Sequence, residues 1–195
     1  MTQQDSDGRV ARRKASRRKI IECTRMLIVE GYSEPTAEQV AESTGLTIRT
    51  VFRHFPDMKS LYLEVLSEGR DLARAVMDEP LPSGDAAELL RIIVDRRARV
   101  YEHLLPMQIS RTLLAERSDR AQSDTKNDIR RRRRRLKHIL PQEVVDDPLL
   151  FEAIDGVLSV VFWVSLRRDQ GLSAKRAKDV MLGAALRLTG LSETK

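Results

Sequence analysis

The stretch that most restricts the fold of this 195-residue chain is residues 36–55, which read TAEQVAESTGLTIRTVFRHF. It predicts two short helices joined by a tight turn. Thr36 can N-cap the first helix, whose small apolar residues recur at i, i+3 and i+4 spacing. Gly45 can adopt the positive φ that ends a helix, and Thr47 can cap the second helix. Together these features predict a helix-turn-helix motif.

The second predicted helix carries polar side chains suited to the major groove of DNA. Its expected solvent face consists of Thr47, Arg49, Thr50, Arg53 and His54. We expect Arg49, Thr50 and Arg53 to contact base edges, because arginine can donate two parallel hydrogen bonds to guanine. An alternative for Arg49 is that it only neutralises a phosphate.

Contacts to the DNA backbone are expected from residues at the ends of both helices. Thr36 and His54 are expected to hold phosphates and so to fix the register of the protein on the duplex. Phe52 is expected to pack its ring between thymine methyl groups and the sugar-phosphate backbone. The motif therefore supplies contacts of both kinds, to bases and to phosphates.

These residues resemble the DNA-binding signature of the tetracycline-repressor (TetR) family, over about the first third of the chain. The resemblance rests on Thr36, Val40-Ala41, Gly45-Leu46-Thr47, Thr50, Phe52 and His54-Phe55, flanked by Glu30-Gly31-Tyr32, Pro56-Asp57 and Leu61. The family often has a phosphate-binding lysine just after the cap of the following helix. Here Met58 holds that place, and the resemblance implies that Lys59 makes the contact instead.

The function expected from the motif and the resemblance is that of a homodimeric transcription regulator, a repressor, on a pseudo-palindromic operator. The resemblance also implies that a small molecule enters a second domain, changes the separation of the two DNA-binding domains and releases the DNA. Two alternatives are a ligand-independent architectural DNA-binding protein and an all-helical enzyme.

The composition is compatible with a nucleic-acid partner. The chain has 35 basic against 29 acidic residues, a net charge of +6. Aromatic residues make up only 4%, which argues against stacking on single-stranded bases. The one cysteine, Cys23, excludes an intramolecular disulfide and is expected to be a core residue rather than a redox sensor. No signal peptide and no membrane-length apolar run are visible, so we expect a cytoplasmic protein without a membrane partner.

The predicted fold is all-α, with about nine helices in two domains. Residues 1–10 are expected to be a flexible tail that leads into a basic segment, and residues 11–57 to form a three-helix DNA-binding domain. A connecting helix is expected over 57–77, and the break at Glu79–Gly84 precedes a helical ligand-binding and dimerisation domain over 78–195.

Two arginine-rich segments admit more than one interpretation. The segment from Arg12 to Lys19 is either a solubilising tail or an arm laid along or into the minor groove. Arg130–Arg135 are six consecutive arginines, which point to all sides of a helix. They form either a solvated helix with ion pairs, for example to Asp124 and Asp128, or a site for an anionic ligand; direct contact with DNA is the third alternative.

Apolar residues near the end of the chain predict an interface. The stretch Leu149–Leu166 is apolar on nearly every side, which predicts one continuous helix that must be buried all round. A following helix around Ala184 has small residues that permit close helix approach. We therefore expect residues 148–190 to form half of an intermolecular four-helix bundle in a homodimer.

No catalytic or metal-binding pattern is recognised. The histidines His54, His103 and His138 lack metal-ligand spacing, and no phosphate-binding glycine loop or nucleophile elbow is present. We therefore expect no enzyme, no cofactor, no metal and no catalytic residue. His103 is either an ordinary core or surface histidine or a ligand contact in a pocket.

Overall fold

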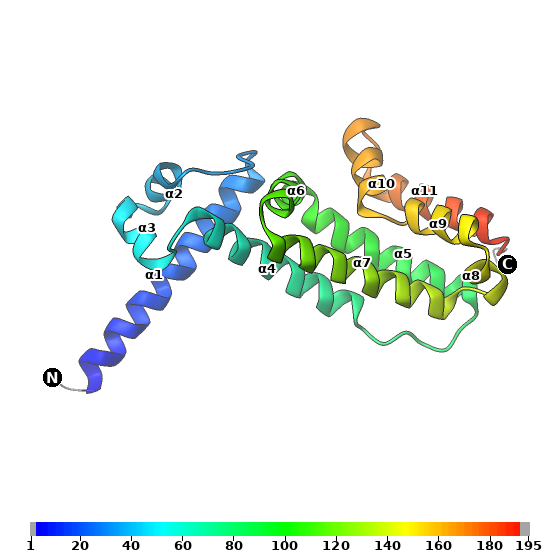
Figure 1. Ribbon diagram of the computed structural model, residues 1–195, viewed down its shortest axis with the longest axis horizontal. Coiled ribbons are helices and arrows are strands. Elements are labelled where there is room, and N and C mark those ends of the chain that lie inside the picture. Colours follow the sequence, from blue (N-terminus) through cyan, green and yellow to red (C-terminus); the bar gives the residue numbers. More distant parts are fainter. Residues whose placement is uncertain (1–2, 192–195) are drawn as a thin grey trace. The chain divides into compact units, whose positions relative to one another are not determined.

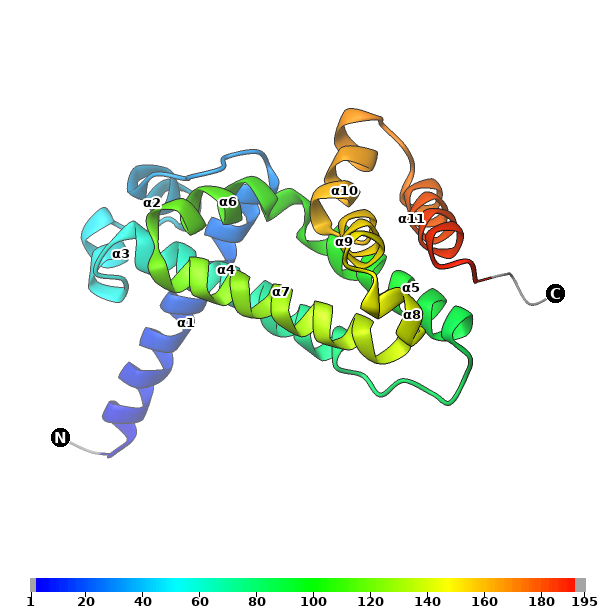
Figure 2. The same cartoon turned by 45° about the vertical axis from the view of Figure 1, so that its right-hand side comes forward.

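The computed structural model describes the backbone of residues 3–191 and the side chains of residues 8–191. Within that range it contains eleven α-helices, one 3-10 turn, one π turn and no strand, which confirms the all-α prediction (Figures 1 and 2). The chain divides into two compact units. The first unit is Met1–Arg70 with Pro106–Gln122, and the second is Asp71–Leu105 with Ser123–Lys195.

The first unit contains the helix-turn-helix. Its helices are α1 (Gln3–Val29), α2 (Ala37–Thr44), α3 (Ile48–His54), the first part of α4 (Met58–Met77) and α6 (Gln108–Arg117). Helix α2 packs against both α1 and α3. The centre of the unit is largely aliphatic with one aromatic ring, and its hydrophobic side chains that are at most 2% exposed are Ile20, Ile28, Val40, Val51, Phe55, Leu61, Val65 and Met107. These residues hold α3 against the rest of the unit.

Helix α1 is longer than the sequence pattern predicted. We expected the first helix to follow the basic segment, yet α1 already begins at Gln3. Residues 3–10 of the predicted tail are therefore helical, and residues 1–2 lie outside the described residues. Helix α1 ends before Gly31, whose φ of 112° is in the region that favours glycine.

The second unit is built around α5 (Ala86–Leu104), which Asp85 caps through the backbone N–H of Glu88 at 2.8 Å. The 3-10 turn η1 (Leu105–Met107), which contains Pro106, follows it. The remaining elements are α7 (Asp119–Ile139), α8 (Gln142–Asp146), α9 (Pro148–Val157), α10 (Val160–Val164), η2 (Ser165–Asp169) and α11 (Ala174–Thr189). Helix α11 packs against α5 and α9, as both views show (Figures 1 and 2).

The single helix predicted over Leu149–Leu166 is wrong. The segment is broken between α9 and α10, because Ser159 takes an extended conformation and caps α10 by accepting a hydrogen bond from Phe162 N at 3.2 Å. Within the described chain Leu149 is 85% and Val161 70% exposed, so burial on all sides would require the second copy of the predicted four-helix bundle. This break and the short helix α8 account for the larger helix count.

No single helix in the range 3–191 is long and apolar enough to cross a membrane. Only the bent pair Pro148–Val157 and Val160–Asp169 meets the length and composition requirements together, with an angle of 41° at the break.

Candidate nucleic-acid interface

The turn between α2 and α3 is fixed at both ends by hydrogen bonds. Thr36 and Gln39 form a reciprocal capping box, in which the Gln39 N–H donates to the Thr36 hydroxyl at 3.3 Å and the Thr36 N–H to the Gln39 side chain at 2.8 Å. At the other end Gly45 takes a φ of 65°, which lets the Leu46 N–H reach the carbonyl of Ala41 at 3.0 Å. The predicted cap and glycine turn are both confirmed.

Helix α3 is oriented by its buried side. Val51 is fully buried and Phe55, just after the helix, is 2% exposed. Thr47 caps the helix by accepting from the Thr50 N–H at 3.2 Å, and the two hydroxyls are 3.0 Å apart. The face opposite Val51 is therefore directed to solvent, with its N-terminal turn well ordered by the cap.

Eight residues were predicted to contact DNA, and all eight belong to the first unit. Those that are exposed are Thr36, Thr47, Arg49, Phe52, Arg53 and Lys59, whereas Thr50 and His54 are half-buried. Six lie on α3 and its cap, Thr36 caps α2, and Lys59 lies in the first turn of α4. The structure thus gathers six of the predicted residues on one short segment.

One feature of this surface, the exposure of Ile48, was missed by sequence reasoning. Ile48, in the first turn of α3, is 39% exposed and adds an apolar contact beside Arg49. Phe52 was assigned to DNA, and at 43% exposed its ring is available. The signal for Ile48 was its place directly after the cap Thr47, on the turn that such motifs direct into the groove.

His54 at the end of α3 has an unusual environment. Both of its ring nitrogens are shielded from solvent and lack a hydrogen-bond partner in the described chain. Burial lowers the pKa of His54, and the nearby cations Arg53, Arg13 and Arg17 lower it further. The neutral imidazole is therefore favoured, because the charged groups that act on His54 are the cations Arg53, Arg13 and Arg17.

Arg17 connects the basic segment of α1 to the body of the first unit. Its guanidinium forms a two-pronged ion pair with Glu64 of α4 and lies 4.5 Å from the centre of the Phe55 ring. Arg12, Arg13, Lys14, Arg18 and Lys19 are exposed, so the basic segment is a helical surface with one anchored arginine. Cys23 is half-buried, and its thiol points to the carbonyl of Ser43 at 3.7 Å.

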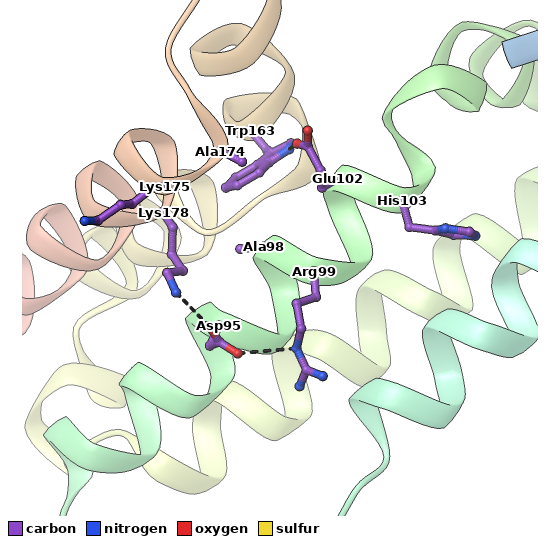
Figure 3. Close-up of a pocket in the computed structure, with 9 residues that line it drawn as sticks. All are labelled: Asp95, Ala98, Arg99, Glu102, His103, Trp163, Ala174, Lys175 and Lys178. Atoms are coloured by element: carbon purple, nitrogen blue, oxygen red, sulfur yellow. Dashed lines mark hydrogen bonds and ion pairs between the residues drawn. The ribbon is translucent and has the colours of Figure 1, made fainter.

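The second unit has a groove of about 460 Å³ between α5 and α11, with the indole of Trp163 at its base (Figure 3). Asp95 on its wall pairs with Lys178 at 2.8 Å and with Arg99 at 3.3 Å. His103 lines the groove but is exposed and extends away from Trp163 (Figure 3). The structure places His103 at a rim rather than inside a closed pocket.

The Trp163 indole is held by a charged partner of α5. It donates to Glu102 at 3.2 Å, and Glu102 also accepts two hydrogen bonds from Arg167, at 2.7 and 2.9 Å. These bonds from Arg167 hold the pKa of Glu102 below its usual range. Across the described residues no group of three or more His, Cys, Asp or Glu side chains could hold a metal ion.

Comparison with known proteins places the helix-turn-helix in a family. Residues 20–65 match the family model described as bacterial regulatory proteins, tetR family. No curated protein matches the chain by sequence.

Solved structures are similar over nearly their whole length. A TetR-like transcriptional regulator from Rhodococcus sp. RHA1 shares 13% identity, with 91% of this chain and 97% of that chain covered and a TM-score of 0.65. A regulator from Aquifex aeolicus VF5 shares 17% identity, with 89% and 98% covered and a TM-score of 0.62. A candidate regulator from Streptomyces coelicolor A3(2) shares 22% identity, with 89% and 98% covered and a TM-score of 0.59. At these identities the likeness shows a shared fold.

The motif geometry, the family match and the shared fold agree with one another. The chain therefore has the fold of a transcriptional regulator and carries, in residues 20–65, the helix-turn-helix DNA-binding domain of the tetR family of bacterial regulatory proteins.

Proposed function

We propose that the protein is a cytoplasmic homodimeric repressor that binds a pseudo-palindromic DNA operator and is released from it by a small-molecule ligand. The observation that carries the proposal is the capped α2–turn–α3 unit, in which a buried Val51 forces Arg49, Phe52 and Arg53 outward. In a helix-turn-helix this face of the second helix enters the major groove. Two copies would read two half-sites about one helical turn apart, roughly 34 Å.

The division of roles among the eight residues follows from their positions. Arg49 and Thr50, in the first turn of α3, and Arg53, one turn later, are assigned to base edges. Thr36, at the N-terminus of α2, and His54 are assigned to phosphates. Phe52 is assigned to thymine methyl groups and Lys59 to a phosphate. Thr47, the N-cap of α3, is assigned to the part of the duplex next to it.

The basic part of α1 is assigned to the same duplex. Its exposed cations repel one another along the helix, for example Lys14 and Arg18 at i, i+4 spacing, and an anionic partner would relieve this cost. The proximity of Arg13 and Arg17 to His54, seen in their effect on its pKa, supports a place beside α3. The helical form of the segment favours backbone contact over insertion of an extended arm.

The division of labour along the chain is also a proposal. Residues 11–57 would bind DNA, residues 57–77 would connect the domains, and residues 78–195 would bind the effector and the second copy. The groove at Trp163 supports a ligand-binding role for the last segment, with His103 at its rim.

Selection of binding sites from randomised duplex DNA tests this function. The expected product is a set of sites with two inverted half-sites at one fixed spacing. An architectural DNA-binding protein would enrich no common sequence, and that outcome would refute the proposal.

Operator affinity is expected to rise as the pH falls from about 7.5 to 6. The pKa of His54 in the free protein is lowered, so the residue is neutral near pH 7. If the imidazole ring rotates on DNA binding, a DNA phosphate can come close to it and raise the pKa of His54. His54 would then gain a proton when the protein binds DNA. By linkage, affinity then increases at lower pH by up to about ten-fold per pH unit for one proton. The variant His54→Asn should lose this dependence, measured by fluorescence anisotropy; an unchanged pH profile would exclude the phosphate role.

Removing two arginines of the run Arg130–Arg135 is expected to leave operator binding nearly unchanged. In the structure Arg133 pairs with Glu152 and Asp155, and Arg132 donates to Tyr101, all within the second unit. The double variant Arg132→Gln and Arg133→Gln should therefore keep the operator Kd within a few-fold. A loss of about a hundred-fold at fixed salt, with the protein still folded by circular dichroism, would place the run on DNA.

A further inference from the structure

The six consecutive arginines on α7 do not behave alike. Most have partners, which are Asn127 for Arg130, Asp78 for Arg131 and Arg135, and Glu152 with Asp155 for Arg133. Asp128, expected to pair within α7, instead lies 3.7 Å from Arg74. Arg134 is exposed and forms no ion pair in the described part of the chain. Arg132 is the remaining member, and its side chain is directed to α5.

Arg132 meets a second arginine that is entirely buried. Arg97 of α5 is 1% exposed. Neither Arg97 nor Arg132 is within ion-pair distance of any carboxylate of the described chain. A buried guanidinium without a carboxylate is uncommon, because a desolvated charge is costly unless it is compensated. Packing alone therefore does not explain why Arg97 and Arg132 lie here without a carboxylate partner.

One hydroxyl and one carbonyl connect the two guanidinium groups. Arg97 Nη1 donates to the carbonyl oxygen of Leu158 at 2.7 Å, and the Tyr101 hydroxyl donates to the same oxygen at 3.1 Å. Arg132 Nη1 in turn donates to the Tyr101 hydroxyl at 2.7 Å, and Cζ of Arg132 lies 5.9 Å from the centre of the Tyr101 ring. Leu158 ends α9 at the helix break, so its carbonyl is free of the helix. Arg97 and the Tyr101 hydroxyl thus share one carbonyl oxygen, and Arg132 is linked to that oxygen only through the Tyr101 hydroxyl.

Hydrogen bonding to that oxygen leaves the cluster incompletely satisfied. Arg97 Nε is buried without a partner. Burial lowers the pKa of Arg97, and the positive charge of Arg132 lowers it further. The acid whose charge acts on Arg97 is Asp155, which already pairs with Arg133 at 2.8 Å. The cluster therefore carries a positive charge, and the N–H group of Arg97 Nε is buried in it without an acceptor.

The surroundings define what kind of molecule could supply the missing negative charge. Phe151 and Leu158 are 3% and 0% exposed, and the Trp163 ring lies 6.5 Å from Tyr101 at a tilt of 57°. Arg132 is half-buried, whereas Arg97 and Tyr101 are buried, so Arg132 is the member of the cluster that is in contact with solvent. Guanidinium groups bind planar or tetrahedral oxyanions through parallel hydrogen bonds.

We propose that Arg97, Tyr101 and Arg132 form a binding site for the oxyanion group, a carboxylate or a phosphate, of a small molecule. The two guanidinium groups would donate to the oxyanion, and the Tyr101 hydroxyl would orient Arg132. Neighbouring aromatic side chains favour a ligand with an apolar body. The site is on α5 and α7, separate from the DNA-binding residues, and it stands whether or not the ligand controls operator binding.

Fluorescence of Trp163, the only tryptophan of the chain, provides the measurement. The full-length protein is titrated with sodium benzoate, sodium hexanoate and inorganic phosphate, each at constant ionic strength against sodium chloride. We expect a saturable change with at least one probe, accompanied by a rise in Tm. Saturation by benzoate or hexanoate alone identifies a carboxylate ligand, and saturation by phosphate alone identifies a phosphate.

Matched variants in the same arginine run assign the site. Arg132→Gln is expected to weaken probe binding by about ten- to a hundred-fold, the usual cost of losing a hydrogen bond to a charged group. Arg134→Gln, two residues along, should bind as the unmodified protein does. Arg132 is half-buried, so its replacement tests the site even if Arg97→Gln does not fold. Absence of saturation with every probe, or equal affinities of the Arg132 and Arg134 variants, would overturn the proposal.

Discussion

Replacing Val161 and Ala184 with aspartate is expected to convert a dimer into a monomer or an aggregate. Val161 on α10 is 70% exposed and Leu149 on α9 is 85% exposed, so the second unit has apolar surface that the described residues leave uncovered. Ala184, on the neighbouring α11, is half-buried beside Gly183. An unpaired carboxylate buried in such an interface costs several kcal/mol, or more than about a hundred-fold in dimer dissociation constant.

Light scattering or analytical ultracentrifugation of both proteins tests this prediction. Leu72→Asp is the matched control, because Leu72 on α4 is 48% exposed and lies outside residues 148–190. The control should remain a dimer, and the double variant should also lose operator binding, since two half-sites are then no longer held together. If the unmodified protein is a monomer in solution, the proposed homodimer is contradicted.

Arg49→Ala is expected to weaken operator binding by about 1–3 kcal/mol, roughly ten- to a hundred-fold. Arg49 is exposed in the first turn of α3, and no side chain in the described chain competes for its guanidinium. If it reads a guanine edge, the variant should also tolerate any base at one symmetric pair of operator positions. Base specificity and affinity would be lost together.

Binding to an operator library at two salt concentrations separates this role from its alternative. A phosphate-binding Arg49 would weaken all sequences alike and reduce the salt slope by about one. Arg120→Ala, an exposed arginine on α7, is the control for loss of charge alone. If the Arg49→Ala variant keeps its base preference and only the salt dependence of binding is reduced, Arg49 contacts a phosphate and does not read a base.

Features encoded by local chemistry were predictable from the sequence. Thr36, Gly45 and Thr47 each act through their own side chain or backbone freedom, so the α2–turn–α3 geometry followed from residue type and spacing. The exposed face of α3 followed from the position of Val51, which must be buried.

Features that depend on contacts distant in sequence were not predictable. Leu149–Leu166 was interpreted as apolar on nearly every side, and Gly156 and Ser159, which lie next to the break, were not recognised as signals for one. Asp78, which is 53 residues from Arg131 in the chain, replaced the expected local partners of the arginine run. Arg97 was overlooked, although it lies four residues after Ile93 and four before Tyr101, on the buried face of α5.

The central claim, sequence-specific operator recognition by α3, is tested most directly by the ratio of two affinities. The Kd of the unmodified protein is measured for its selected operator and for a scrambled duplex of equal length, at the same near-physiological salt concentration. We expect the protein to bind the operator at least about a thousand-fold more tightly than the scrambled duplex. Equal Kd values for the two duplexes, both weakening steeply with salt, would contradict it and show binding through the phosphate backbone alone.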